Sequence, residues 1–259
     1  MTEHSFAICA YKESPYLEEC MLSLINQTVK SNIIISTSTP NEHILAMGQK
    51  YDIPVFVNEG VKGNFGDWNF ALKSADSKYV TLAHHDDVYE PDYAETALKY
   101  LRRSKRPIFF FSDYGELRNG EKITKNRLLQ IKRVLLFPVW LAPGSVFARR
   151  LSLSLGDAIS CPTVTYDREL ILANPFNNEF RCNIDWERWE AMSKLKGDYL
   201  YCNRPLVYHR IYEESTTSAS IGASIRSEED YRMFCRFWPA PVARLLEHFY
   251  AASEKSNEV

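Results

Sequence analysis

The segment His84-His85-Asp86-Asp87 places two imidazoles and two carboxylates directly after the apolar run at residues 79–83. Adjacent carboxylates are most often turn residues or helix caps. At the end of a buried strand, however, they supply the hard oxygen ligands that Mg²⁺ or Mn²⁺ prefers. Such a cation stabilises the negative charge that develops on a departing diphosphate. We therefore predict a cation site in which Asp86 is a ligand and Asp87 supports it or contacts substrate.

The elements that would position this segment alternate between strands and helices. Apolar runs predict five strands, at residues 6–11, 33–35, 53–57, 79–83 and 107–112. Such alternation is typical of an α/β fold in which right-handed crossovers join a mostly parallel central sheet with helices on both faces. Ligands bind beyond the carboxyl ends of such strands. The tips of the first four strands should therefore line one site.

The second half of the chain is less regular. Its patterns predict a basic amphipathic helix over 122–136, a helix over 185–196 that begins near Asp185, and a strand over 199–209. A terminal helix pair is expected over 228–252. With no clear linker, we expect one domain over 1–220, with residues 221–259 as its helical extension.

Charge is distributed unevenly along a chain whose net charge is −2. Residues 1–100 carry a net charge of −7, residues 101–150 carry +9, and the remainder carries −4. The basic stretch is either a solvated helix face or a contact for an anionic acceptor or membrane surface. The slightly acidic total, without a recognised binding module, argues against a nucleic-acid partner.

The cysteine pattern and hydropathy favour a cytoplasmic location. Six cysteines are scattered without CxxC spacing, as in proteins of reducing compartments. No apolar run has the length of a membrane-spanning helix, and no leader sequence is evident. We expect a cytoplasmic protein and leave open peripheral contact with the inner face of the membrane and a homo-oligomer.

Five segments together resemble family 2 glycosyltransferases of the GT-A fold. They are AYKESPYLEECMLSLINQT (10–28), GNFGDWNFALKSADSKYVTLAHHDDVYEPDY (63–93), CPTVTYDREL (161–170), NIDWERWEAM (183–192) and VYHRIYEESTT (207–217). The resemblance covers most of residues 5–217. Its strength lies in the order and spacing of the segments, because each motif alone is only moderately specific.

The resemblance implies a nucleotide-sugar site at the strand tips. Its expected members are Ala10, Tyr11, Glu13, Thr37, Asn58, Asp67, Asn69, His84, His85, Asp86, Asp87 and Arg210. Two positions depart from the family pattern. Residues 36–39 read Ser-Thr-Ser-Thr where an acidic pair is common, and His84 replaces the first Asp of the DxD-type motif. Asp67 is also a candidate cap for a helix expected over 68–75.

The resemblance also implies the groups that act on the acceptor. Asp185 matches the carboxylate that serves as general base, with Glu187 as the alternative. Trp186 and Trp189 are expected either to form an acceptor wall or to pack in the core. His209 is expected beside Asp86 at the metal, although a residue three positions later, Tyr212, stands where relatives often have histidine.

The function implied is a metal-dependent inverting transferase that uses Mn²⁺ or Mg²⁺. It would move a hexose of glucose or galactose type from a UDP-sugar to a glycan, glycoprotein or lipid-linked acceptor, as in surface polysaccharide or glycoprotein biosynthesis. One alternative is a non-catalytic binding or assembly subunit, which the altered tips at Ser36-Thr37 and His84 motivate. Another is a nucleotidyltransferase, for which AYKESP is a poor phosphate loop.

Overall fold

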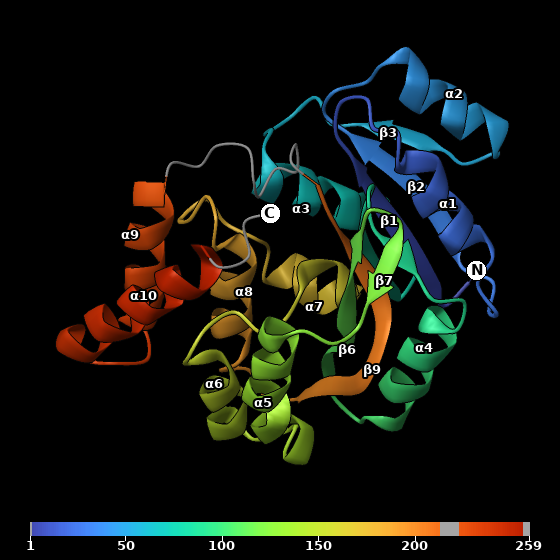
Figure 1. Ribbon diagram of the computed structural model, residues 1–259. Helices are drawn as coiled ribbons and strands as arrows, with labels where there is room; N and C mark the ends of the chain where they lie inside the picture. The colour runs from blue at the N-terminus through green and yellow to red at the C-terminus, as the bar shows by residue number, and fades with distance from the viewer. Residues whose placement is uncertain (1, 213–222, 256–259) are drawn as a thin grey trace.

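A computed structural model describes residues 2–212 and 223–255 of the protein (Figure 1). Its centre is a nine-stranded sheet in the order β3-β2-β1-β4-β8-β6-β9-β5, with β7 paired to β6. The first four strands along the chain are parallel, as expected, and their bounds are β1 (His4–Ala10), β2 (Asn32–Thr37), β3 (Val55–Val57) and β4 (Tyr79–His84).

The other half of the sheet is mixed. Strand β8 (Val164–Asp167) lies antiparallel between β4 and β6 (Pro107–Arg118). Strand β9 (Asp198–Ile211) is parallel to β6, whereas the short β5 (Val88–Tyr89) and β7 (Glu121–Ile123) pair antiparallel. Antiparallel pairs need no crossover helix. The expected parallel order therefore holds for the region that alternates strand and helix, and the irregular region adds antiparallel strands.

Helices cover both faces of the sheet, and each face has its own apolar core. One core packs against α1 (Leu17–Ile25), α2 (Glu42–Lys50) and α4 (Tyr93–Arg103). The other packs against α3 (Asn64–Ser74), α5 (Arg127–Leu141), α6 (Val146–Leu153), α7 (Arg168–Ala173), α8 (Ile184–Met192), α9 (Ala223–Phe234) and α10 (Ala240–Lys255). Alternate residues of β4 enter opposite cores, since Val80 and Leu82 face one and Tyr79 and Ala83 face the other.

Several expected helix boundaries change. The basic helix begins at Arg127 rather than residue 122, because residues 121–123 form β7. Helix α3 begins at Asn64 with Gly63 as its N-cap, so Asp67 lies in the first turn and is not the cap residue. The terminal helix pair is confirmed as α9 and α10. The boundary expected at residues 220 and 221 lies outside the described residues. Throughout 2–212 and 223–255, every helix is too short or too polar to cross a bilayer.

A histidine on the first strand is buried as a neutral residue. The His4 side chain is 1% exposed, and its two ring nitrogens lie 2.8 Å from the hydroxyls of Ser31 and Thr81. Burial disfavours the imidazolium and lowers the pKa of His4 to about 3. An unfolded histidine titrates near about 6.5. Acid therefore favours the unfolded state, in which His4 can take up a proton. The stability that neutral His4 contributes is fully present above that value and is lost as the pH falls toward 3.

We expect the free energy of unfolding to fall between pH 7 and pH 5 by up to about 2 kcal/mol from His4 alone. Urea denaturation at the two pH values would measure the loss. The His4→Gln variant should lose less on acidification, because its side chain does not titrate. His248→Gln, at an exposed position, is the control and should behave as the parent. Equal acid sensitivity in His4→Gln and the parent would contradict the assignment.

Candidate functional site

The carboxyl ends of the four parallel strands lie side by side at one edge of the sheet. In register, Ala10 pairs with Thr37, and Thr37 pairs with Val57. On the other side of β1, Cys9 pairs with His84, the last residue of β4. The acidic turn therefore lies next to the β1 tip, where an α/β sheet commonly binds its ligand.

The β1 tip leaves the sheet through a sharp turn. Ala10 is buried, whereas Tyr11 is 45% exposed and Glu13 is also exposed. Lys12 between them has a positive φ of 54°, and its N–H donates to Oγ1 of Thr39 at 2.6 Å. This contact joins the β1 and β2 tips. It leaves Tyr11 and Glu13 facing solvent, where both can meet a ligand.

The loop after β3 is organised by Asp67. Its Oδ1 accepts from Nδ2 of Asn58 at 2.7 Å, and its Oδ2 accepts from Oγ of Ser38 at 2.9 Å and from the N–H of Gly63 at 3.1 Å. Asn58 is 3% exposed and also donates to the carbonyl of Val61. Both side chains hold the loop against the β2 tip. Asn58 and Asp67 thus fix the shape of the loop that borders the site.

Two further side chains expected in the nucleoside pocket are engaged internally. Thr37 is 2% exposed, and its Oγ1 accepts from the N–H of Thr39 at 3.0 Å. The Asn69 amide donates to the carbonyl of Phe176 and accepts from the Phe176 N–H, at 2.8 and 3.0 Å. Both ends of the Asn69 amide thus tie α3 to the chain before α8, and its contact with the nucleoside stays a prediction.

The two histidines of the acidic turn pack against the β1 side of the site. The ring of His84 stacks on Trp68 with centroids 5.6 Å apart, and its buried Nε2 has no hydrogen-bond partner within the described residues. Burial lowers the pKa of His84, against the opposing charges of Asp87 and Asp86. Nδ1 of His85 lies 3.0 Å from the carbonyl of Cys9. Trp68 thus fixes the position of the His84 ring at the start of the acidic turn.

Asp86 meets the last residues of β9. Its Oδ2 accepts from the Tyr212 hydroxyl at 3.1 Å, and its backbone carbonyl accepts from Nε of Arg210 at 2.9 Å. The side chain is 9% exposed. Of the two residues considered beside Asp86, Tyr212 contacts its carboxylate, whereas His209 contacts Asp87. Residues 213–217, the end of the last segment that carries the family resemblance, lie outside the described residues.

Asp87 is an internal ion-pair partner. It is fully buried, and its Oδ1 lies 3.0 Å from both Nδ1 of His209 and the N–H of Arg210. Burial disfavours the carboxylate, but His209 and the Arg210 amide hold the pKa of Asp87 below its ordinary value. Burial likewise disfavours the His209 imidazolium, but Asp87 raises the pKa of His209 to about 9. Asp87 is thus too deep to touch a substrate, which corrects its predicted contact with the nucleotide sugar.

Arg210 is also committed to the protein interior. Its side chain is 8% exposed, Nη2 donates to Oε2 of Glu19 at 2.5 Å, and the guanidinium lies 4.2 Å from the centre of the Tyr16 ring. With Nε bonded to the Asp86 carbonyl, this side chain joins β9, α1 and the acidic turn. Arg210, which was predicted at the nucleotide-sugar site, is bonded to protein groups in this structure.

The donor set at the turn fits a divalent cation through Asp86. No three His, Cys, Asp or Glu side chains converge as a cation site within residues 2–212 and 223–255. Mg²⁺ and similar ions commonly bind one or two carboxylates and complete their shell with phosphates and water. Asp86 meets that requirement at the sheet edge. Nδ1 of His209 faces Asp87, so this side chain could offer a cation only its Nε2, as the neutral imidazole.

Asp185 stands in the first turn of α8, where its Oδ1 accepts from the N–H of Trp186 at 2.9 Å. The residue is partly buried. Burial raises the pKa of its carboxyl, against the hydrogen bond from Trp186 and the charges of His84 and Lys132. His84 of the acidic turn is thus one of the groups that act on the Asp185 carboxyl. A carboxylate with a raised pKa is a stronger base.

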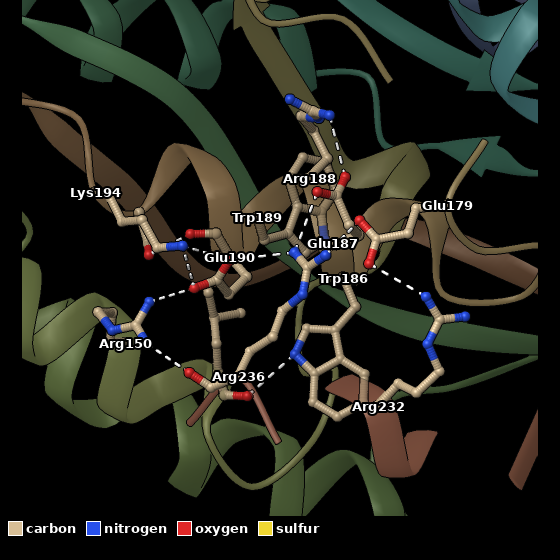
Figure 2. Close-up of polar contacts among 12 residues, drawn as sticks. Arg150, Glu179, Trp186, Glu187, Arg188, Trp189, Glu190, Lys194, Arg232 and Arg236 are labelled. Carbon is tan, nitrogen blue, oxygen red and sulfur yellow. Dashed lines mark hydrogen bonds and ion pairs between the residues drawn. The ribbon is translucent and has the colours of Figure 1, made fainter. Parts of the chain in front are cut away.

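Salt bridges on the flank of α8 fix the helix that carries Asp185. Figure 2 shows Glu187 and Glu190 of α8 facing arginines from two other segments of the chain, with Arg188 of α8 itself beside Glu187. Glu190 pairs with Arg150 of α6 and with Arg236, and Arg236 also pairs with Glu187 at 3.2 Å. Glu187 is 4% exposed. This pairing removes Glu187 as the alternative base.

The prediction that Trp186 and Trp189 form an acceptor wall is wrong, because both side chains are fully buried. The indole N–H of Trp186 donates to the carbonyl of Leu153 at 3.1 Å, and its ring packs edge-on against Phe234. The ring of Trp189 stacks on Tyr166. The two tryptophans join α8 to the core instead.

Replacement of Trp186 by alanine should therefore act on stability, at a cost of about 3–5 kcal/mol, since it leaves a large core cavity. Urea denaturation would measure this loss. Trp140→Ala, at a half-exposed position on α5, is the matched control and should cost about 0.5 kcal/mol or less. An unchanged stability with a raised acceptor KM would restore the acceptor role of Trp186.

Sequence reasoning missed two neighbours of the site, Trp68 and Glu19. Trp68 lies on α3 and stacks on His84, while Glu19 lies on α1 and pairs with Arg210. Each is separated in sequence from its partner and belongs to an amphipathic helix, so no local motif distinguishes it. Only the packing of these helices on the sheet brings them to the site.

Comparison with known sequences places this geometry in a family. The profile described as Glycosyl transferase family 2 matches residues 5–164. An uncharacterized glycosyltransferase of Methanocaldococcus jannaschii is 24% identical over 83% of this chain and 76% of its own length. The Escherichia coli UDP-Glc:alpha-D-GlcNAc-diphosphoundecaprenol beta-1,3-glucosyltransferase WfgD is 25% identical over 55% of this chain and 49% of its own length.

Solved structures share the fold. S. aureus TarS in complex with UDP-GlcNAc superimposes with a TM-score of 0.68 at 16% identity, covering 96% of this chain and 73% of that one. Mannosyltransferase PcManGT from Pyrobaculum calidifontis, in complex with GDP-Man and Mn²⁺, gives a TM-score of 0.62 at 12% identity, covering 99% and 76%. The α/β architecture is thus that of GT-A-like glycosyltransferases.

Proposed function

Because the chain belongs to glycosyl transferase family 2, we propose that this glycosyltransferase moves a hexose from a UDP-sugar to an acceptor hydroxyl with inversion at the anomeric carbon. The observation that carries the proposal is the position of Asp86, directly after β4 and next to the β1 tip, at the ligand-binding edge of the sheet. Glucose or galactose is the proposed sugar, and a glycan, glycoprotein or lipid-linked molecule is the proposed acceptor, in surface polysaccharide or glycoprotein biosynthesis.

The nucleotide would lie along the β1 and β2 tips. Tyr11 and Glu13 are exposed there and are the proposed contacts, with the backbone of Ala10 beneath them. Asp67 and Asn58 would keep the neighbouring loop in shape rather than touch the base, since their polar atoms bond to the loop itself. His84 and His85 border the diphosphate side of the same edge.

Asp86 is the group that would hold Mn²⁺ or Mg²⁺. When bound, the cation supplies positive charge that stabilises the leaving diphosphate. Asp87 and His209 would support Asp86 indirectly, because their ion pair fixes the end of β9 against the acidic turn. Tyr212 would position the Asp86 carboxylate through its hydroxyl.

Asp185 is the proposed general base. The acceptor hydroxyl oxygen forms a bond to the anomeric carbon as the bond from that carbon to the diphosphate breaks, and the hydroxyl proton passes to the Asp185 carboxylate. UDP is the leaving group. The raised pKa of Asp185 favours proton uptake at this step.

The relatives support this choice of substrates. The name of WfgD specifies UDP-Glc as donor and a diphosphoundecaprenol-linked sugar as acceptor, and TarS is a neighbour with UDP-GlcNAc bound. PcManGT is a neighbour in complex with GDP-Man, so the first point to test is whether the donor carries UDP or GDP. Nucleotide release from UDP-glucose, UDP-galactose, UDP-GlcNAc and GDP-mannose with Mn²⁺ present would test it. Faster release from the two UDP-hexoses is expected, and release from GDP-mannose alone would contradict the proposal.

The same assay separates the alternatives. A non-catalytic subunit would bind UDP in calorimetry without releasing it from any donor. A nucleotidyltransferase would release pyrophosphate from UTP and a sugar phosphate. The cytoplasmic location, the homo-oligomer and the division into residues 1–220 and 221–259 stay predictions.

A further inference from the structure

An apolar surface on α5 and α6 lies outside the substrate site. Val134, Phe137 and Leu141 of α5 are 72%, 54% and 61% exposed, and Phe147 of α6 is 75% exposed. The two helices pack side by side, at the lower end of the molecule in Figure 1. We call this surface the α5–α6 face and define it by six residues, Val134, Phe137, Trp140, Leu141, Phe147 and Leu151. Large exposed side chains so close together mark an interaction surface.

The orientation of α5 is fixed by its opposite side. Leu129, Leu136 and Val139 are buried against the protein core, and Nε of Arg133 pairs with Oδ2 of Asp113 at 2.5 Å. The helix therefore has no freedom to rotate its outer residues inward. Val134, Phe137 and Leu141 recur at helical spacing on the outer side. The α5–α6 face therefore stays on the outside of the protein.

The stretch of sequence that forms the α5–α6 face carries charge of one sign. Residues 122–156 contain seven Lys and Arg and no Asp or Glu, in a chain whose net charge is −2. Lys122, Arg133 and Arg150 of this stretch pair with carboxylates elsewhere, and Arg149 is fully buried. Lys125 and Arg127, just before and at the start of α5, are exposed and form no ion pair with any described residue. Apolar and aromatic side chains flanked by unopposed cations are typical of surfaces that bind anionic membranes.

We propose that the α5–α6 face docks the protein on the surface of an anionic lipid bilayer. The apolar side chains would enter the boundary between headgroups and acyl chains, and Lys125 and Arg127 would meet the anionic headgroups. A second copy of the chain fits less well as the occupant. A two-fold contact would oppose each basic surface with the same basic surface, so like charges would repel. The proposal does not depend on the transferase activity.

The structure also indicates which aromatic residues are unsuited to this role. Toward the C-terminal end of the chain, Phe234 is fully buried and packs on Trp186, and the indole of Trp238 donates to the carbonyl of Ser154. The membrane contact that the sequence left open for the basic stretch is thus assigned to the α5–α6 face. Phe249 of α10 is the exposed exception, at 64%, and serves below in the control.

Co-sedimentation with vesicles tests the proposal. The parent protein should bind phosphatidylcholine vesicles that contain phosphatidylglycerol, and more weakly when salt is raised or phosphatidylglycerol is omitted. The triple variant Phe137→Ser/Leu141→Ser/Phe147→Ser should bind at least about a hundredfold more weakly, because it removes three side chains from the apolar contact. Lys125→Glu/Arg127→Glu should weaken binding only to the anionic vesicles.

The matched control is Leu245→Ser/Phe249→Ser, which removes comparably exposed apolar residues from α10 and should bind vesicles as the parent does. Circular dichroism and nucleotide release should be unchanged in the triple variant, because its substitutions are on the surface away from Asp86 and Asp185. Equal vesicle binding by the triple variant and the parent would overturn the proposal. The proposal would also be overturned if the parent protein bound no vesicles at any salt concentration. This includes the case where sedimentation velocity shows a dimer that the triple variant loses.

Discussion

Asp185→Asn should reduce the rate of sugar transfer by roughly 10²- to 10⁴-fold, the range that a general base contributes. Asparagine keeps the size of the side chain and can still accept from the Trp186 N–H, so α8 should fold as before. It has no carboxylate to take the acceptor proton. Because donor binding relies on the strand tips, the affinity for UDP in calorimetry should stay within about twofold of the parent value.

Two comparisons sharpen this result. Glu187→Gln alters the other acidic residue in the first turn of α8 and should keep kcat, because Glu187 is buried among arginines rather than open to an acceptor. As the pH is lowered, the parent's kcat/KM should begin to fall at a pH above the ordinary pKa of aspartate, since burial raises the pKa of Asp185. Loss of this acid limb in the residual activity of Asp185→Asn is expected. Full transfer activity in Asp185→Asn would remove the residue from the mechanism.

Asp86→Asn should reduce metal-dependent nucleotide release by roughly 10²-fold or more, as expected when a cation that stabilises the leaving group is bound less well. The amide is a weaker ligand for a hard cation than the carboxylate. It can still accept from the Tyr212 hydroxyl, so the end of β9 should keep its place. Titration of activity with Mn²⁺ would show a raised half-saturating concentration.

The control for this variant is Asp92→Asn, which alters a partly exposed carboxylate that pairs with Arg204 beyond the acidic turn. Its dependence on Mn²⁺ should match that of the parent. A metal dependence unchanged in Asp86→Asn would exclude the predicted ligand. Activity of the parent that persists in chelator would instead exclude the cation itself, so the two failures are distinguishable.

The sequence determined the strand-and-helix alternation of the first hundred residues. The apolar runs and caps there are local features, and β1 through β4 form near the residues predicted. Since parallel strands end at a common edge, the proximity of Tyr11 to the acidic turn also followed from the sequence. The position of Asp185 in the first turn of α8 could likewise be read from its local pattern.

Tertiary structure decided which polar residues face a ligand. Asp86 and Asp87 are neighbours in sequence, yet one contacts Tyr212 near the surface and the other is fully buried against His209. Strand β9 makes this difference, and its pairing with the distant β6 cannot be read from local patterns. The burial of Trp186 depends in the same way on α6 and α9. Local spacing thus set the elements and their tips, whereas contacts between residues far apart in the chain set the exposure and charge of each side chain.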